Sequence, residues 1–289
     1  MTSDPSRIIA FQGAPGAYSD LACREVFPAM ETLACDAFEE AIAAVREGRA
    51  LYAMLPIENS VAGRVADIHH LMPGSGLFII AEHFQRVEHH LLALPGATLA
   101  GLKSVRSHVH ALSQCRAFIR AHGLRVQVAA DTAGSAAEVA QRGDPTVAAI
   151  ASALAGPIYG LVSLKENIED EEHNTTRFLV MARAPQPLPP GCERAVTTFV
   201  FNVRNVPAAL YKALGGFATN GVNMTKLESY MVGGRFTATQ FYADVEGHPD
   251  DRPLKLALEE LRFFSREVTI LGTYPAHPFR ADAGQAGTD

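Results

Sequence analysis

The chain has 289 residues, of which 48% are hydrophobic and 19% charged, and this composition predicts a folded protein with a substantial core. Its 31 acidic and 25 basic residues leave a formal net charge of −6. Binding to a phosphate backbone needs an excess of clustered Lys and Arg, so this balance disfavours a nucleic-acid binder. At about 100–200 residues per domain, the length predicts two domains.

The sequence shows no sign of membrane insertion or export. No apolar run approaches the roughly 18–20 residues of a membrane span, and the first residues lack the apolar stretch of a signal peptide. We therefore expect a cytoplasmic protein. The four cysteines contain no C-x-x-C pair, which predicts reduced, mostly buried thiols rather than a disulfide framework or a zinc site: Cys23, Cys35, Cys115 and Cys192.

Up to residue 182, short apolar runs alternate with helical patterns, which is typical of α/β layering. Two groups of such units joined by a crossover predict two lobes with a cleft between them, where ligands bind beyond the carboxyl ends of the strands. The strands are expected at 7–11, 33–35, 51–55, 77–82, 88–94, 104–107, 125–129, 147–150 and 178–182. The helices are expected at 17–26, 37–47, 110–122 and 132–141, with a further helical stretch after Ser60.

A domain boundary is expected at 184–191, where four of eight residues are proline. Beyond it, the expected order is βαββαβ, a ferredoxin-like unit with strands at 196–203, 222–230, 236–245 and 267–273 and helices at 208–219 and 253–264. Gly233-Gly234 is expected to be a hairpin turn. The predicted organisation is a first domain at 1–183, a linker at 184–194, a second domain at 195–275 and a frayed tail at 276–289.

Two glycine- and serine-containing turns come between a strand and a helix, where free N–H groups favour an anion. The first holds Gly13, Gly16, Tyr18 and Ser19; it lacks the ending of a P-loop, and a simple tight turn is the alternative reading. The second begins at Ser107, which is expected to be a helix N-cap. His108 in this turn could donate a proton near neutral pH.

A third polar cluster, Glu58-Asn59-Ser60, follows the strand at 51–55. Ser60 as the N-cap of a helix would explain one hydroxyl but not all three side chains. The pairs His69-His70 and His89-His90 lack the spacing of metal ligands, so no metal site is expected.

The fourth cluster, Asn174-Thr175-Thr176-Arg177, directly precedes the apolar strand that starts at Phe178. A guanidinium matches a carboxylate in a bidentate manner, so Arg177 is the candidate for holding an anionic substrate. Alternatively, Arg177 pairs with the acidic run at 165–173, which has one basic and five acidic residues.

These motifs, in this order, resemble the prephenate dehydratase family. The matching strings are Gly13-x-x-Gly16-x-Tyr18-Ser19, Pro56-Ile-Glu-Asn-Ser60, Ser107-His108 with Ala-Leu-x-Gln-Cys115, Asp131-Thr-Ala133 and Asn174-x-Thr-Arg-Phe178. Residues 196–274 resemble the ACT domain, with Gly221-Val-Asn-Met-Thr-Lys-Leu-Glu-Ser229 as its signature. The resemblance covers nearly the whole chain. It implies an α/β catalytic region of two subdomains, like type II periplasmic binding proteins, joined to an α+β ferredoxin-like ACT domain.

The resemblance implies the decarboxylating dehydration of prephenate to phenylpyruvate, CO2 and water, in L-phenylalanine biosynthesis, without a cofactor or metal. Thr176 matches the threonine that the family regards as essential, and we interpret it as a positioned donor to the leaving hydroxyl. Phe178 would line an apolar wall that favours decarboxylation. Candidates for holding the substrate are Asn59, Ser60, Ser107, Asn174, Thr175 and Arg177. Further site candidates are Tyr18, Glu58 and His108, the last two as alternative proton donors.

The resemblance also implies that L-phenylalanine regulates the enzyme by binding between ACT domains of a homodimer or homotetramer. The effector-binding candidates are Ala209, Leu210, Gly221, Asn223, Met224, Glu228 and Ser229. Three departures from the family pattern occur. His110 replaces a glutamine, Tyr230-Met231 replaces Arg-Pro, and Ala208-Ala-Leu-Tyr211 replaces Gly-Ala-Leu-Val.

Two other functions remain open from the sequence. The same chemistry on arogenate would need an acceptor for the amino group, such as Glu58. A sensor that binds ligands without catalysis would also fit a cleft joined to an ACT domain, but it would not need the leaving-group donor in Asn-x-Thr-Arg-Phe.

Overall fold

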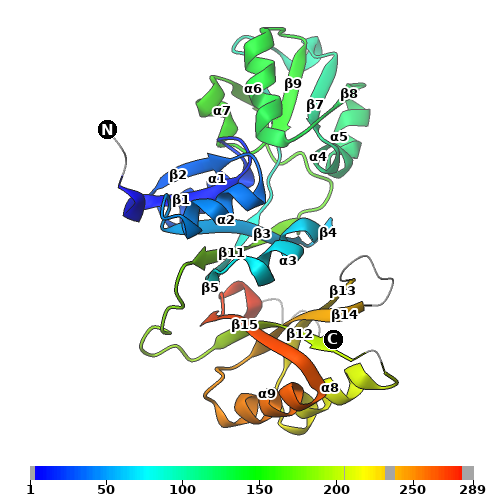
Figure 1. The fold of residues 1–289 in the computed structure, drawn as a ribbon. Helices are drawn as coiled ribbons and strands as arrows, with labels where there is room; N and C mark the ends of the chain where they lie inside the picture. The colour runs from blue at the N-terminus through cyan, green and yellow to red at the C-terminus, as the bar shows by residue number, and fades with distance from the viewer. Residues whose placement is uncertain (1–3, 205, 232–237, 282–289) are drawn as a thin grey trace. The chain divides into compact units, whose positions relative to one another are not determined.

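A computed structural model of the chain describes residues 4–204, 206–231 and 238–281 (Figure 1). The expected turn at Gly233-Gly234 lies outside these residues. Contacts divide the chain into two compact units: Met1–Ile68 with His83–Phe178, and His69–Glu82 with Leu179–Asp289. Two strands, β5 (Phe78–Arg86) and β11 (Thr175–Ala182), have residues in both units.

The first unit begins with a sheet of strand order β2-β1-β3-β11-β5, in which β2 and β3 run parallel to β1 and β4 pairs antiparallel with β3. Its buried residues include Ile9, Phe11, Met54 and Ile57, and helices α1 and α2 contact β1 and β3 (Figure 1). The elements are β1 (Ile8–Gln12), α1 (Tyr18–Val26), β2 (Glu31–Cys35), α2 (Phe38–Arg46), β3 (Tyr52–Asn59), β4 (Gly63–Arg64) and α3 (Ala66–Leu71).

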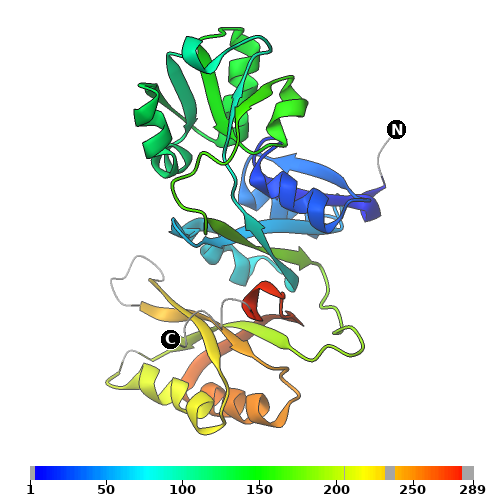
Figure 2. The same ribbon diagram turned by 180° about the vertical axis from the view of Figure 1, so that it is seen from behind.

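The second sheet of the first unit has the order β10-β6-β9-β7-β8 (Figure 2). Strands β7, β8 and β9 run parallel to one another, β6 runs antiparallel to β9, and the edge strand β10 runs antiparallel to β6. The two sheets confirm the predicted two-subdomain fold. The elements are β6 (His90–Ala93), β7 (Ser104–His108), α4 (Val109–Gln114), α5 (Arg116–Ala121), β8 (Arg125–Ala129), α6 (Thr132–Arg142), β9 (Val147–Ala151), α7 (Ala155–Tyr159) and β10 (Val162–Lys165).

The single helix expected at 110–122 is two helices, α4 and α5, which separate at Cys115. The Asp170 carboxylate explains the break, because it accepts hydrogen bonds from Arg116 N at 2.9 Å and Ala117 N at 3.0 Å and so begins a new helix. Part of the acidic run at 165–173 is therefore structural. Helix α7 and strand β10 were not predicted. Three short 3₁₀ helices complete the elements of the described residues: Pro5–Arg7, Met72–Gly74 and Leu99–Gly101.

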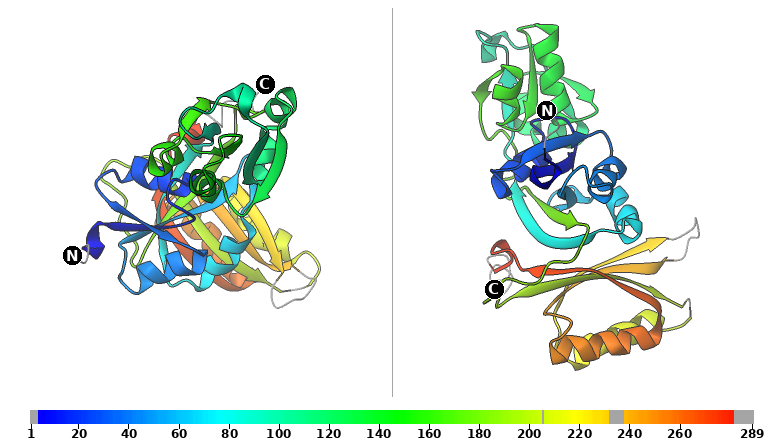
Figure 3. Two further views of the ribbon diagram at one scale, coloured as in Figure 1. Left: turned by 90° about the horizontal axis from the view of Figure 1, so that it is seen from above. Right: turned by 60° about the vertical axis from the view of Figure 1, so that its left-hand side comes forward.

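The second unit confirms the predicted βαββαβ order. Its antiparallel strands follow the order β13-β14-β12-β15, and helices α8 and α9 cover one face of the sheet (Figure 3). Phe199, Phe201, Phe217 and Leu258 form part of the core between them. The elements are β12 (Ala195–Val203), α8 (Ala209–Thr219), β13 (Met224–Met231), β14 (Ala238–Glu246), α9 (Arg252–Phe264) and β15 (Ser265–Pro275).

The chain after Pro275 does not fray where its composition predicts. Ala276 N donates to Arg194 O at 2.9 Å, and the Arg280 guanidinium contacts both carboxylate oxygens of Glu82, at 2.6 and 2.8 Å. The Glu82 side chain is fully buried. The predicted tail is thus wrong for 276–281, because a buried carboxylate provides a partner that composition cannot reveal. Residues 282–289 lie outside the described range.

All four cysteines are described, and they are free thiols: Cys23, Cys35 and Cys115 are buried and Cys192 is half-buried. Burial raises the pKa of the Cys35 thiol to about 11. Within the described residues, each helix is too short or too polar to cross a membrane.

Candidate active site

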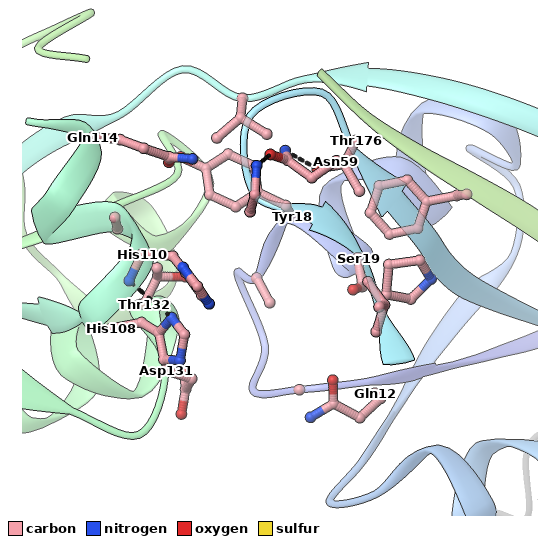
Figure 4. Close-up of a pocket in the computed structure, with 18 of the residues that line it drawn as sticks. Gln12, Tyr18, Ser19, Asn59, His108, His110, Gln114, Asp131, Thr132 and Thr176 are labelled. Atoms are coloured by element: carbon pink, nitrogen blue, oxygen red, sulfur yellow. Dashed lines mark hydrogen bonds between the residues drawn. The ribbon is translucent and has the colours of Figure 1, made fainter. Parts of the chain in front are cut away.

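A cavity of about 550 Å³ lies in the first unit, lined from both sheets. Figure 4 shows Asn59 and Thr176 on one side and His108, His110 and Asp131 on the other, with Tyr18 between them. The polar residues that line the cavity are Gln12, Tyr18, Ser19, Asn59, Arg64, His89, His108, His110, Gln114, Asp131, Thr132 and Thr176.

Strand β11 brings alternate residues of the Asn-x-Thr-Arg-Phe motif to the cavity. Successive side chains of a strand point to opposite faces, so Thr176 and Phe178 line the cavity while Arg177 between them does not. Arg177 is 3% exposed and donates through Nη1 to Glu58 Oε1 at 2.9 Å. Thr175 likewise lies outside the cavity lining.

Strand β3 repeats this alternation. Asn59 lines the cavity, whereas the Glu58 carboxylate pairs with Arg177. The chain then turns back into β4, and Gly63, which closes the turn, has a φ of +82° that disfavours other residues. The next residue, Arg64, lines the cavity. Of these two arginines, Arg64 lines the cavity and Arg177 does not, so Arg64 becomes the candidate for contact with a bound anion.

Asn59 holds Thr176 directly. Its Nδ2 donates to Thr176 Oγ1 at 2.9 Å and to Asn174 Oδ1 at 2.8 Å. Its Oδ1 accepts from the backbone N–H groups of Val61 and Ala62, at 3.0 and 2.8 Å. Asn59 thus joins the β3–β4 turn to the Thr176 hydroxyl.

Further hydrogen bonds extend from Asn174 to Tyr18. Asn174 Nδ2 donates to Gln114 Oε1 at 3.0 Å, and this oxygen lies 2.9 Å from His89 Nε2. His89 Nδ1 lies 2.8 Å from the Tyr18 hydroxyl, which donates to Glu88 O at 2.7 Å. Burial raises the pKa of Tyr18 well above its ordinary value and lowers that of His89.

Two serines predicted to cap helices have other roles. Ser60 is exposed in the β3–β4 turn, where its Oγ donates to His173 O at 2.8 Å and accepts from Thr175 N at 2.9 Å. Ser107 is fully buried and donates to Ile150 O at 2.6 Å. Neither serine lies in the cavity lining.

The N-cap of α4 is His108, whose Nδ1 accepts from His110 N at 3.3 Å. The rings of His108 and His110 lie 5.0 Å apart, and both line the cavity. Burial, followed by the neighbouring His110, lowers the pKa of His108. Asp131 caps α6 through Gly134 N and also lines the cavity. The second sheet thus contributes two imidazoles and a carboxylate.

Several residues that line the cavity were not predicted from the sequence. Gln114 and Asp131 belong to motif strings quoted above but received no role, His89 was considered only as a metal ligand and dismissed, and nothing in the sequence marked Arg64. Among the described residues, no group of three or more His, Cys, Asp or Glu is arranged to hold a metal ion.

Within a single chain, the residues predicted to bind the effector do not all lie at one place in the second unit. Ala209 and Leu210, at the start of α8, line a cavity of about 310 Å³ with Val203 and Phe241. Asn223 donates to Glu246, and Glu228 pairs with Lys226 at 3.3 Å. The other three are Gly221 after α8, and Met224 and Ser229 on the edge strand β13, all outside that cavity.

The sequence model of one family, described as prephenate dehydratase, matches residues 9–186. A protein from Komagataeibacter europaeus, named bifunctional N-acyl-homoserine lactone acylase/prephenate dehydratase, is 57% identical over 95% of this chain and 98% of its own. Arogenate dehydratase/prephenate dehydratase 1 of Arabidopsis thaliana is 39% identical over 94% of this chain and 73% of its own.

Among solved structures, prephenate dehydratase from Arthrobacter aurescens in complex with L-Phe superposes with a TM-score of 0.84. It is 31% identical in sequence, and the match covers 96% of this chain and 97% of that one. The likeness therefore extends through both compact units.

Proposed function

This chain belongs to the prephenate dehydratase family of hydro-lyases, and from that premise we propose that it converts prephenate to phenylpyruvate. The prephenate dianion takes up one proton and yields the phenylpyruvate monoanion, CO2 and water. The ring carboxylate leaves as CO2, its bonding electrons pass into the ring, and the C4–O bond breaks as the ring becomes aromatic. The enzyme must therefore anchor two carboxylates and supply a proton to the departing hydroxyl.

The observation that carries this proposal is the hydrogen bond from Asn59 to Thr176. Because Asn59 Nδ2 donates to Thr176 Oγ1, a lone pair of that oxygen is occupied and the hydroxyl proton is available to an acceptor in the cavity. A threonine hydroxyl is too weakly acidic to act as a free general acid, so its placement matters more than its pKa. The proton is restored from water.

Charge and burial in the cavity suit a dianion that must lose one carboxylate. Arg64 supplies a guanidinium, and α1 begins at Tyr18 and Ser19, so that the positive end of the helix dipole faces the cavity. Phe178, which is 1% exposed, gives an apolar wall. An ionised carboxylate is poorly solvated beside such a wall, which favours its loss as CO2.

The direct test is turnover of prephenate by the purified protein, followed as phenylpyruvate formation without added metal or nucleotide. Thr176→Val should lower kcat by at least about 100-fold at an unchanged melting temperature. Thr175→Val, the neighbouring position outside the cavity lining, should stay within about threefold of wild type. Normal turnover by Thr176→Val would remove Thr176 from this role.

Arogenate is the second candidate substrate, because one relative is named for both activities. The acceptor first considered for its ammonium group, Glu58, is paired with Arg177. Asp131 lines the cavity and is the carboxylate that we propose instead. The ratio of kcat/KM on the two substrates decides between them.

Hydrolysis of N-acyl-homoserine lactones is a further candidate, supported by the 57% identity to a relative that carries this activity in its name. Incubation with an N-acyl-homoserine lactone and detection of free homoserine lactone by mass spectrometry tests it. Thr176→Val serves as a control, since an activity that survives this change does not depend on the dehydratase hydroxyl.

Regulation by L-phenylalanine is proposed for the second unit, as an ACT domain acting across a homodimer or homotetramer. Support comes from its βαββαβ order, from the cavity at Ala209 and Leu210, and from the L-Phe complex of the Arthrobacter protein. Rate curves with and without phenylalanine, and the molecular mass in solution, test this proposal. A cytoplasmic location is proposed from the free cysteines.

A further inference from the structure

Each hydrogen bond between Thr176 and His89 has a fixed donor and a fixed acceptor, and the backbone of the β3–β4 turn determines which is which. Two backbone N–H groups, of Val61 and Ala62, point at Asn59 Oδ1. The amide oxygen of Asn59 must therefore face the turn, and Nδ2 must face β11. Both N–H bonds of Nδ2 are then used, one on Asn174 Oδ1 and one on Thr176 Oγ1.

The same reasoning orients the next two amides. Because Asn174 Oδ1 accepts from Asn59, its Nδ2 must be the donor to Gln114 Oε1. That oxygen cannot donate, yet it lies 2.9 Å from His89 Nε2. His89 Nε2 must therefore carry a hydrogen, and the neutral ring is the Nε2–H tautomer with Nδ1 as an acceptor. The Tyr18 hydroxyl then shares its one hydrogen between Glu88 O at 2.7 Å and His89 Nδ1 at 2.8 Å.

Burial makes this chain of amides sensitive to the loss of a member. His89 is 2% exposed and Asn174 is 1% exposed, so water does not readily replace a lost partner. Ionisable groups surround the ring. The Glu169 carboxylate accepts from His89 N at 2.8 Å, Tyr18 packs edge-on at 5.6 Å, and Glu88 and His90 flank it in sequence. The ring is thus fixed at its backbone and at both nitrogens.

We propose that His89 is a positioning residue for Thr176. Its Nε2–H group holds Gln114, which in turn holds Asn174 and Asn59, and this sequence of bonds keeps the Thr176 oxygen as an acceptor with its proton directed into the cavity. The role of Thr176 in this statement rests on the proposed function. The neighbouring His90 has no such role, because its Nδ1 lies 3.1 Å from Ser163 Oγ in the second sheet.

The tautomer of His89 is measurable without catalysis. Long-range ¹H–¹⁵N spectra of the full-length protein labelled at histidine, assigned with His89→Gln, should show His89 protonated at Nε2 and unprotonated at Nδ1 at neutral pH. A neutral ring protonated at Nδ1 would require the reverse amide orientation and would overturn the proposal.

Kinetics test whether the chain of bonds matters for turnover. His89→Leu should lower kcat on prephenate by about 10- to 100-fold while KM stays within about twofold, because a displaced catalytic group costs rate more than binding. His89→Gln, whose side-chain amide can donate to Gln114 Oε1, should recover part of that loss. His90→Leu is the matched control and should remain within about threefold of wild type.

The double variant of His89 and Thr176 separates a positioning role of His89 from a general disturbance of the structure. In Thr176→Val protein, His89→Leu should lower the residual kcat by less than about threefold, because its target hydroxyl is absent. An equal loss in both backgrounds would show that His89 acts independently of Thr176. If Thr176→Val has no measurable turnover, the tautomer of His89 measured by NMR decides whether the proposal stands.

Wild-type protein that fails to convert prephenate would refute the proposed function. The NMR result would still report on the direction of the hydrogen bonds.

Discussion

Arg177 donates through Nη1 to Glu58 Oε1 over 2.9 Å and so joins β11 to β3 away from the cavity. The guanidinium also lies 5.9 Å from the centre of the Phe84 ring. The motif residue best suited to bind a carboxylate of the substrate is thus engaged by a carboxylate of the protein. Thr176 and Arg177, adjacent in sequence, act on opposite faces of one strand.

Replacing Arg177 should therefore affect stability more than binding. Arg177→Met removes the partner of the partly buried Glu58 carboxylate, and we expect it to lower the free energy of unfolding by about 2–3 kcal/mol. Glu58→Gln, which keeps an acceptor, should cost less. Thermal unfolding and KM for prephenate are the measurements, and a tenfold rise in KM at unchanged melting temperature would return Arg177 to the substrate.

Arg64 should show the reverse behaviour. Arg64→Met removes a guanidinium from the cavity lining, and a charged hydrogen bond of about 1.5–3 kcal/mol corresponds to a rise in KM of about 10- to 100-fold. Arg64→Lys should recover only part of this, because an ammonium lacks the bidentate fork. Steady-state kinetics measure the effect, and an unchanged KM in Arg64→Met would exclude Arg64 as an anchor.

Asp131→Asn separates the two candidate substrates. The amide keeps the N-cap of α6, so the fold should be retained. Loss of the carboxylate should lower kcat/KM for arogenate by about tenfold or more, because an ammonium loses its counter-charge. For prephenate, kcat/KM should stay the same or rise, since a negative charge no longer faces a dianion. Equal effects on both substrates would rule out Asp131 as the discriminating group.

Acid should destabilise the protein through two histidines of the cavity. Burial lowers the pKa of His89 and of His108 in the folded state, so the unfolded chain takes up protons first as the pH falls below about 6.5. Their stabilising contribution is complete above that pH and is lost as the pH falls through the folded values. Melting temperatures between pH 7.5 and 5 should fall less steeply in His89→Gln/His108→Gln protein, and parallel slopes would contradict this.

Ala208 occupies a backbone conformation that suits glycine. Its φ is +62° at the N-cap of α8, where the family pattern has glycine. Relief of the left-handed strain, less the greater freedom of glycine in the unfolded chain, should make Ala208→Gly more stable by about 0.5–1 kcal/mol. Ala213→Gly within the same helix should instead be destabilising. Thermal unfolding distinguishes the two, and a lower melting temperature for Ala208→Gly would be the contrary result.

Elements with regular apolar patterns were predictable from the sequence, whereas the polar ends of two strands were not. Strand β3 continues to Asn59 and β11 begins at Thr175, although Glu58-Asn59 and Thr175-Thr176-Arg177 have the composition of loops. If these residues are assigned to strands, successive side chains point to opposite faces, and Thr176 and Arg177 are predicted on different sides of the sheet. Treating them as one polar cluster placed both in the site.

Long-range partners were beyond the reach of local patterns. His89 and Gln114 meet across 25 positions, and Asn59 and Asn174 across 115. Such contacts depend on how the sheets pack, which propensity and spacing do not encode. The motif strings identified Thr176 and Asn59, but the order in which the amides connect them to His89 required the fold.

The Arg280 guanidinium makes the end of the chain part of the structure. It contacts Glu82 on β5 and lies 3.6 Å from the Asp244 carboxylate on β14, and both acidic side chains are fully buried. Deleting the residues after Pro275 would take the cation away from two acidic groups that have little access to water. An affinity tag or fusion partner therefore belongs beyond Ala281 or at the amino terminus, and a truncated second unit is a poor substitute for the full chain in effector-binding experiments.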